Sequence, residues 1–188
     1  MKSGRAVVYP VYKGTYERSD GVDLPTIRPY GTHRYLEYLT MWVKDARRTI
    51  DYLESRDDID AERIAYYGLS WGGYMANVIP AVEKRLKATI VVIGGFSQTP
   101  SYLDEPFPEA DLLNYAPRVT IPTLMLNGRY DLNIPFETHA KPMFDFLGTP
   151  AEHKFHKVYD TDHFVPRNEL IKESLDFLDR YLGPVTLN

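Results

Sequence analysis

One serine of this chain lies in a sequence that can make it a nucleophile. Ser70 is in the middle of residues 68–73, which read GLSWGG, between a predicted strand and a predicted helix. A G-x-S-x-G sequence at such a junction permits a sharp, strained turn that projects the serine above a sheet. A nucleotide-binding glycine loop is the main alternative, but no lysine follows the glycines and no G-x-G-x-x-G is present. The pattern therefore favours a nucleophile elbow.

A serine hydroxyl needs a base that takes its proton, and the base needs an acid that orients it. In the hydrolase order Ser…Asp/Glu…His, the acid follows a later core strand and the histidine follows the last strand. Asp131 and His163 occupy these places in the sequence. Each residue also has a plainer interpretation, because Asp131 can cap a helix beginning near Pro135 and His163 can be a surface loop residue.

Other residues fit the base and the acid less well. Four histidines are set aside because they precede the serine, lie inside a predicted helix, or lie before or within a predicted strand: His33, His139, His153 and His156. Asp160 and Asp162 stay open as alternatives for the acid, although both are close to His163 in the sequence. The predicted triad is Ser70, His163 and Asp131.

The elements that must position these residues alternate along the chain. Apolar runs predict strands over 6–9, 63–67, 88–93, 122–127 and 155–159. Helical spacing predicts helices over 32–55, 71–84, 136–147 and 171–182, with prolines at 80 and 142 interrupting the second and third. The run 88–93 is typical of a central strand covered on both faces, whereas 155–159 is polar enough for an edge. We therefore expect an α/β protein, with a mostly parallel sheet of about five strands flanked by helices, in a single domain over residues 1–188.

Composition excludes several classes of function. The chain has 188 residues, a formal net charge of −4 and no cysteine. A mildly acidic chain lacks the basic surface of a dedicated nucleic-acid binder, and a chain without cysteine has no thiolate zinc site, disulfide or cysteine nucleophile. The histidines show no metal-ligand spacing, so neither a metal nor another cofactor is expected. No apolar run approaches the roughly 18 residues of a membrane span, and the first residues do not read as a signal peptide, which favours a cytoplasmic location.

Four separated stretches resemble the α/β-hydrolase superfamily. Residues 68–74, GLSWGGY, resemble the elbow of prolyl-oligopeptidase-like and dienelactone-hydrolase-like members, and residues 57–65 are similar to the connection before that elbow. Residues 127–131 and 162–164 resemble the acid and histidine loops of the same families. The resemblance covers almost the whole chain and implies Ser70 as nucleophile, His163 as general base and Asp131 as orienting acid. Because many dienelactone hydrolases use a cysteine nucleophile, that activity is disfavoured here.

The chain departs from the superfamily at its beginning. The superfamily sheet usually has eight strands, and this chain begins at what resembles the fourth, so we expect a truncated α/β-hydrolase fold. The missing loop after strand three normally supplies one of two oxyanion-hole amides; the Trp71 amide is the other. We expect residues 10–12 to lie beside the elbow, so that the amide of Val11 or Tyr12 is the second donor. Uncovered strand edges favour pairing with another chain, so a homodimer is expected.

The expected substrate follows from the residues near the predicted site. Residues 94–120 are long enough for a short cap-like insertion, and Trp71, Tyr74, Phe96 and Tyr102 are candidates to line an apolar acyl pocket, although core packing is the favoured interpretation for each taken alone. A small open site suits a serine carboxylesterase acting on short-chain acyl esters. The alternatives are a prolyl-oligopeptidase-like peptidase, favoured by Gly-Gly-Tyr after the elbow, and a catalytically weak hydrolase fold that serves as an assembly module.

Overall fold

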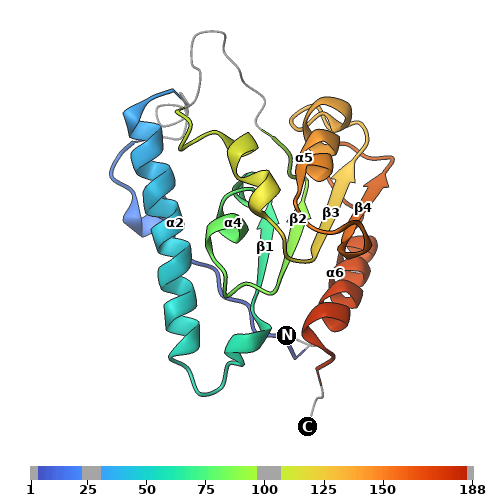
Figure 1. Cartoon of the computed structure of the whole chain (residues 1–188), viewed down its shortest axis with the longest axis horizontal. Coiled ribbons are helices and arrows are strands. Elements are labelled where there is room, and N and C mark those ends of the chain that lie inside the picture. The colour runs from blue at the N-terminus through green and yellow to red at the C-terminus, as the bar shows by residue number, and fades with distance from the viewer. Residues whose placement is uncertain (1–3, 23–30, 97–106, 186–188) are drawn as a thin grey trace.

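The computed structural model describes residues 4–22, 31–96 and 107–185, and its centre is a parallel sheet (Figure 1). The four strands are β1 (Ala65–Leu69), β2 (Ala88–Val92), β3 (Thr123–Gly128) and β4 (Lys154–Tyr159). They lie in the order β1-β2-β3-β4, and every neighbouring pair is parallel. The carboxyl ends of all four strands therefore meet at one edge of the sheet, where open α/β sheets bind their ligands.

Helices cover the two faces of the sheet. They are α2 (His33–Glu54), α3 (Trp71–Met75), α4 (Ile79–Val82), α5 (Lys141–Phe146) and α6 (Arg167–Leu182). Short 3₁₀ turns occupy Tyr16–Arg18, Ala61–Arg63, Leu112–Asn114, Ala116–Arg118 and Ala151–His153, and a π-helical turn occupies Phe136–Ala140.

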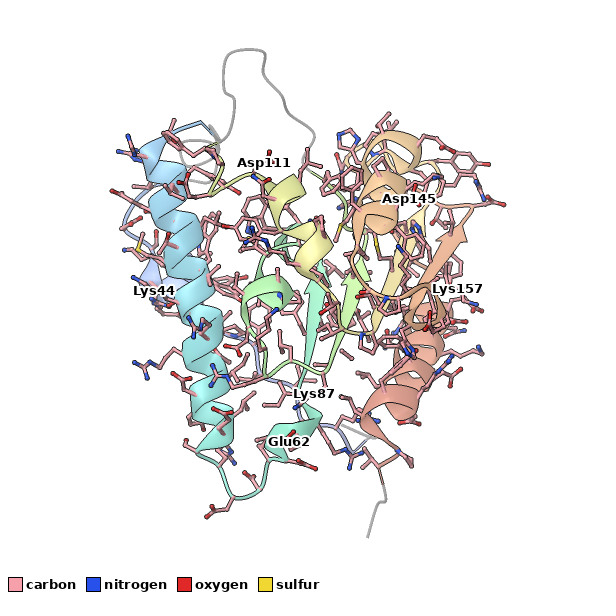
Figure 2. The ribbon with its side chains drawn as sticks, in the orientation of Figure 1. Lys44, Glu62, Lys87, Asp111, Asp145 and Lys157 are labelled. Atoms are coloured by element: carbon pink, nitrogen blue, oxygen red, sulfur yellow. The ribbon has the colours of Figure 1, made fainter. Side chains whose placement is uncertain are left out.

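Alternate residues of the central strands feed two separate core clusters. On one face Ile90 and Leu124 pack with Phe177 of α6. On the other face Val91 and Met125 pack with Met143 of α5, with Ala81 of α4 and with Ala76, which follows α3. Lys87 and Glu62 lie outside these clusters and pair at 2.7 Å near the amino edge of the sheet (Figure 2). Both faces of β2 and β3 are thus buried, and so are the few polar residues within these strands, Thr89, Thr123 and Asn127.

The expected strand over residues 6–9 does not form. Val7 and Tyr9 are 68% and 77% exposed and pair with no strand. Arg5 is bound to Asp179 and to the Gly183 carbonyl at the end of α6, while the Lys13 amide donates to Asp45 of α2. These anchors draw the segment between two helices rather than along β1, so the described sheet has four strands rather than about five.

The other expected elements form with shifted ends. The first strand covers 65–69 rather than 63–67 because Ala61–Arg63 makes a 3₁₀ turn that the Asp60 carboxylate caps. Both prolines interrupt their helices as expected, since a proline in the first turn opens α4 and α5. The interior position of 88–93 and the edge position of 155–159 are also confirmed. Within residues 94–120, positions 97–106 lie outside the described part, so the cap-like insertion stays a prediction.

Candidate active site

Ser70 lies at the junction between β1 and α3, in a strained backbone conformation. Its φ is +51° and its ψ is −105°, values that side chains other than glycine rarely adopt. The Ser70 amide donates to the Val92 carbonyl at the end of β2, at 2.9 Å. A strained residue of this kind costs on the order of 1–3 kcal/mol and persists only when its surroundings enforce it.

The glycines around Ser70 allow the turn to close. A Cβ atom on Gly68 would lie 2.2 Å from the Gly72 carbonyl oxygen, and one on Gly73 would lie 2.8 Å from the Gly94 Cα. Both contacts are with backbone, so neither can be relieved by turning a side chain. Gly72 has more room, because its nearest neighbour is the Tyr66 hydroxyl at 3.7 Å. The G-x-S-x-G sequence thus has a direct steric reason at Gly68.

The structure brings the three residues of the predicted triad together. Ser70 Oγ lies 3.0 Å from His163 Nε2, and His163 Nδ1 lies 2.7 Å from Asp131 Oδ2. A carboxylate only accepts hydrogen bonds, so Nδ1 carries the proton of the neutral imidazole and Nε2 is left with a lone pair toward the serine. In this tautomer the imidazole can take the proton of Ser70 Oγ.

The Asp131 carboxylate is fixed on both of its oxygens. Asp131 is only 2% exposed, and Oδ1 accepts the amides of Asn133 at 2.8 Å and Ile134 at 2.9 Å. One carboxylate oxygen thus closes an Asx turn and the other faces His163, whereas the π-helical turn that begins at Phe136 has no side-chain cap, so Asp131 does not cap a helix near Pro135. The two amides were not expected from the sequence, although an Asx turn after Asp131 is the signal that could have indicated them.

The loops that carry Asp131 and His163 are joined directly. The Arg129 amide donates to the Tyr159 carbonyl at 2.8 Å, and the Tyr130 amide to the Thr161 carbonyl at 2.9 Å. Gly128 contacts the backbone of Asp162 so closely that a Cβ atom there would lie 1.8 Å from its carbonyl oxygen.

The alternative acids are placed differently from Asp131. Asp160 forms an exposed ion pair with Arg129 at 3.0 Å, and Asp162 is also exposed. Within the described residues, His163 Nδ1 donates its hydrogen bond to Asp131 Oδ2.

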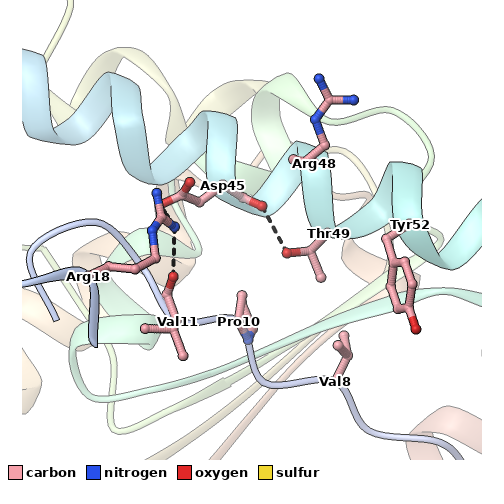
Figure 3. Close-up of a pocket in the computed structure, with 8 residues that line it drawn as sticks. All are labelled: Val8, Pro10, Val11, Arg18, Asp45, Arg48, Thr49 and Tyr52. Atoms are coloured by element: carbon pink, nitrogen blue, oxygen red, sulfur yellow. Dashed lines mark hydrogen bonds and ion pairs between the residues drawn. The ribbon is translucent and has the colours of Figure 1, made fainter. Parts of the chain in front are cut away.

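Val11 and Tyr12, the expected sources of a second oxyanion donor, lie in different surroundings. Val11 lines a groove of about 300 Å³ between residues 8–18 and α2, and its carbonyl accepts from Arg18 at 2.7 Å (Figure 3). The Tyr12 ring packs in the core cluster that also holds Trp71, and burial raises the pKa of Tyr12 to about 12. Tyr12 thus shares a core cluster with Trp71 and Val11 does not, and no hydrogen bond between described residues uses either backbone amide.

Of the four aromatic residues expected near a substrate, three lie in the described part of the chain. Trp71 stacks on Tyr74, with ring centroids 4.9 Å apart, but Tyr74 is 4% exposed and its hydroxyl lies 3.1 Å from that of Tyr35 in the core. This placement argues against substrate contact by Tyr74. Phe96 is half-buried against Phe146, and Tyr102 lies outside the described residues.

Two exposed apolar residues that were not expected directly follow triad residues in the sequence. Leu132 directly follows Asp131 and is 87% exposed, and Phe164 directly follows His163 and is 52% exposed. Their places next to the acid and the histidine in the sequence are the signal that could have indicated them.

Neither a metal centre nor a membrane helix is found in residues 4–22, 31–96 and 107–185. These residues hold no group of three or more His, Asp or Glu side chains arranged to bind a metal ion. None of their helices is both long enough and apolar enough to cross a bilayer.

Comparison with known proteins gives several matches to proteins named as cutinases. Cutinase 2 of Thermobifida cellulosilytica is 27% identical over 171 residues, which cover 89% of this chain and 56% of that protein. Bis(hydroxyethyl) terephthalate hydrolase of Streptomyces coelicolor is 28% identical over 146 residues, covering 73% of this chain and 42% of that protein. The chain spans about half the length of the curated relatives it matches.

A solved structure and a family model extend these matches to the fold and the family. A cold-adapted esterase from an Arctic intertidal metagenomic library, bound to PEG, superposes with a TM-score of 0.68 and 24% identity, over 90% of this chain and 67% of that one. This similarity, together with the parallel sheet and its flanking helices, shows an α/β-hydrolase fold. The family model described as PET hydrolase-like matches residues 14–184, so the chain belongs to the PET hydrolase-like family.

Proposed function

We propose that this protein is a serine carboxylesterase that works through an acyl-enzyme. The observation that carries the proposal is the chain of contacts at the carboxyl edge of the sheet, 3.0 Å from Ser70 Oγ to His163 Nε2 and 2.7 Å from His163 Nδ1 to Asp131 Oδ2. The names of the relatives, cutinase and bis(hydroxyethyl) terephthalate hydrolase, support an ester as the substrate.

The reaction divides into acylation and deacylation. Ser70 Oγ attacks the ester carbonyl while its proton moves to His163 Nε2, and His163 then gives this proton to the leaving alcohol. A water molecule, deprotonated by His163, attacks the acyl-enzyme and releases the acid. Asp131 holds the imidazole in the required tautomer and stabilises the imidazolium ion that forms in each step.

The oxyanion that forms in both steps needs hydrogen-bond donors. The Trp71 amide, which follows the nucleophile, is one. For the second donor we favour the Tyr12 amide over that of Val11, because the Tyr12 ring packs in the cluster that holds Trp71 whereas Val11 lines the groove along α2. Loss of one such donor typically costs about a hundred- to a thousandfold in rate. A phosphonate adduct of Ser70 whose phosphoryl oxygen contacts only the Trp71 amide would contradict the role of Tyr12.

Short-chain acyl esters are the proposed substrates. We propose that the exposed side chains of Leu132 and Phe164, which follow Asp131 and His163 in the sequence, form an apolar border of the site, which favours esters over charged substrates. Bis(hydroxyethyl) terephthalate, which the name of one relative specifies, is a second ester worth testing.

The test is hydrolysis of p-nitrophenyl esters from acetate to decanoate by the wild type and by Ser70→Ala. The proposal expects activity that is highest for short chains and is lost in the variant. A folded wild type no more active than Ser70→Ala would contradict it and favour the assembly module. Cleavage of aminoacyl-proline amides in preference to esters would favour the peptidase.

A homodimer is the proposed assembly. The Ile64 carbonyl and the Ser70 amide both bond to the β2 side, so the backbone groups of Ala65, Tyr67 and Leu69 point away from it. No described strand pairs with that edge, and Tyr67 and Leu69 are 49% and 52% exposed. Light scattering should give twice the chain mass, and Leu69→Lys should lower it; a monomer at micromolar concentration contradicts the dimer.

A further inference from the structure

We propose that Asn127 and His156, neither of which touches the substrate, are positioning residues that hold the Ser70 turn in its reactive geometry. The inference rests on the proposed esterase function. It starts from a chain of hydrogen bonds that crosses the carboxyl edge of the sheet, from His156 on β4 through Asn127 on β3 to Gly94 after β2.

The orientation of the Asn127 amide follows from its two partners. Asn127 is fully buried, its Nδ2 lies 2.9 Å from the Gly94 carbonyl oxygen, and its Oδ1 lies 3.0 Å from His156 Nε2. A carbonyl oxygen only accepts, so the NH₂ group must face Gly94 and Oδ1 must face the histidine. Nε2 of His156 therefore carries a proton. This is the tautomer opposite to the one that the geometry implies for His163.

The surroundings of His156 keep its imidazole neutral. The ring lies between Phe136 and Phe144, with centroids 5.4 Å and 4.9 Å away. Burial lowers the pKa of His156 to about 4, while the nearby charges of Asp145 and Lys141 act in opposite directions. These two residues of α5 also pair with each other, and Asp145 lies on the outer side of that helix (Figure 2). At neutral pH, His156 is therefore an uncharged donor to Asn127.

The carbonyl at the other end of the chain of hydrogen bonds belongs to a strained junction. Ile93, between β2 and Gly94, has a φ of +43°, which is an outlier for a β-branched residue. One side of the junction is fixed by the bond from the Ser70 amide to the Val92 carbonyl, and the other by the bond from Asn127 to Gly94. The Ile93 amide stays bonded to the Leu126 carbonyl at 2.7 Å, so loss of the second bond releases only the Gly94 side of the junction, where the φ of Ile93 can relax toward negative values.

Relaxation at Ile93 would move the nucleophile turn. The backbones of Gly94 and Gly73 touch, since a Cβ atom on Gly94 would lie 2.8 Å from Gly73 Cα. Gly73 belongs to the first turn of α3, which begins directly after Ser70. A shift of Gly94 therefore passes to the Ser70 turn through rigid backbone contacts rather than through flexible side chains.

Asn127 is also joined to the other two loops of the triad. It lies four residues before Asp131 on the same strand end, and its neighbour Gly128 contacts the backbone of Asp162, next to His163. One buried amide thus fixes the distance between the nucleophile turn and the loops that carry the acid and the base. A displacement of about 1 Å in such a site can cost about a hundredfold in rate.

The experiment compares Asn127→Leu with a matched variant of the same strand, Thr123→Val. Thr123 is equally buried, and its hydroxyl bonds to the Ile121 carbonyl at 3.0 Å, but it lies at the amino end of β3. Both variants lose a buried hydrogen bond, so both should unfold at a lower temperature. We expect kcat for p-nitrophenyl acetate to fall about ten- to a hundredfold, with KM within about twofold, only in Asn127→Leu. Equal kcat in the two variants overturns the proposal.

Two variants of His156 test whether a replacement that keeps the hydrogen-bond donor also keeps the activity. His156→Gln retains an N–H donor toward Asn127 Oδ1, whereas His156→Leu does not. The Gln variant should keep kcat within about threefold of the wild type, and the Leu variant should lose about tenfold, in line with a donor that acts only through position. Equal loss in both variants contradicts the hydrogen-bond chain.

Two readouts separate this proposal from the esterase proposal. In the ¹⁵N spectrum of the Ser70→Ala protein, His156 should show a protonated Nε2, and Asn127→Asp should raise its pKa by placing a carboxylate beside it. The rate at which a fluorophosphonate labels Ser70 reports the nucleophile without a substrate. Slower labelling in Asn127→Leu than in Thr123→Val supports positioning even if no ester is hydrolysed. An active wild type with equal labelling in both variants overturns positioning alone, and a wild type that neither labels nor hydrolyses overturns both proposals.

Discussion

Replacing Asp131 by asparagine should remove the reactivity of Ser70 while leaving the fold intact. The carboxylate accepts two backbone amides on Oδ1, at 2.8 Å and 2.9 Å, and the His163 Nδ1 proton on Oδ2 at 2.7 Å. An asparagine has only one acceptor oxygen, and the two amides cannot turn away, so its oxygen will face them. The NH₂ group then faces His163 Nδ1, which must become an acceptor.

The expected loss can be worked out from that tautomer. With Nδ1 as acceptor, the proton of the neutral ring moves to Nε2, which can no longer take the Ser70 proton across 3.0 Å. The corresponding change in a Ser-His-Asp protease lowers kcat about 10⁴-fold, which is about 5.4 kcal/mol of transition-state stabilisation. We expect a loss of this order in kcat for p-nitrophenyl acetate, with little change in KM.

The control is Asp60→Asn. Asp60 also caps a turn, since its carboxylate accepts the Glu62 amide at 3.0 Å, but it lies before β1, at the amino edge of the sheet. This variant should keep wild-type kcat. An Asp131→Asn protein that retains more than about a tenth of wild-type kcat would mean that His163 keeps its productive tautomer without the carboxylate, and the role assigned to Asp131 would be refuted.

Three further predictions concern stability. Gly68→Ala should lower the free energy of unfolding by about 2–3 kcal/mol or more in urea titrations, because the new Cβ atom would lie 2.2 Å from the Gly72 carbonyl oxygen, whereas Gly72→Ala should cost less than about 1 kcal/mol. Glu83 is 4% exposed, and its hydrogen bond from Arg85 lowers its pKa. The ionised carboxylate therefore contributes to the free energy of unfolding above the unfolded pKa of about 4.5, and this contribution is lost as pH falls further. Glu83→Gln should cost about 1–3 kcal/mol at pH 7 and flatten the acid limb of the stability curve. The pKa of His156 is lowered to about 4 in the folded protein, so as pH falls the unfolded chain protonates this imidazole before the folded chain does. The free energy of unfolding should therefore fall by up to about 3 kcal/mol between about pH 6.5 and pH 4. A stability curve that is unchanged in His156→Gln contradicts this cause.

Much of the fold could be predicted because the central strands consist almost entirely of apolar residues. The apolar run that became β2 indicates burial on both faces, and all its residues are buried. Residues 6–9 show the limit of this reasoning. Their apolar pattern is as strand-like as that of β2, but the Arg5 and Lys13 anchors at the two ends of the segment decide its path. Anchors between residues far apart in sequence leave no local pattern, so the expected strand was wrong.

The candidate site was predictable to the extent that it depends on local backbone chemistry. The glycines beside Ser70 indicate a strained turn because few other residues fit there, as the contact between Gly68 and Gly72 shows. Asn127 and His156 were missed for the opposite reason. An asparagine at the end of one strand and a histidine inside the next have no spacing that links them, and only the parallel pairing of β3 with β4 brings them to 3.0 Å.

Strain at two neighbouring residues explains why such a pairing is needed. Ser70 and Ile93 both have positive φ, and the bond from the Ser70 amide to the Val92 carbonyl joins the two turns. Each strained residue destabilises the folded state by about 1–3 kcal/mol. Two of them together are a large fraction of the free energy of unfolding of a typical domain, which is about 5–15 kcal/mol. Strands that are buried on both faces supply the free energy that opposes this strain. The hydrogen bond from the Asn127 amide to the Gly94 carbonyl links the strained turn to these strands. The serine is therefore held by the ends of three strands rather than by its own loop.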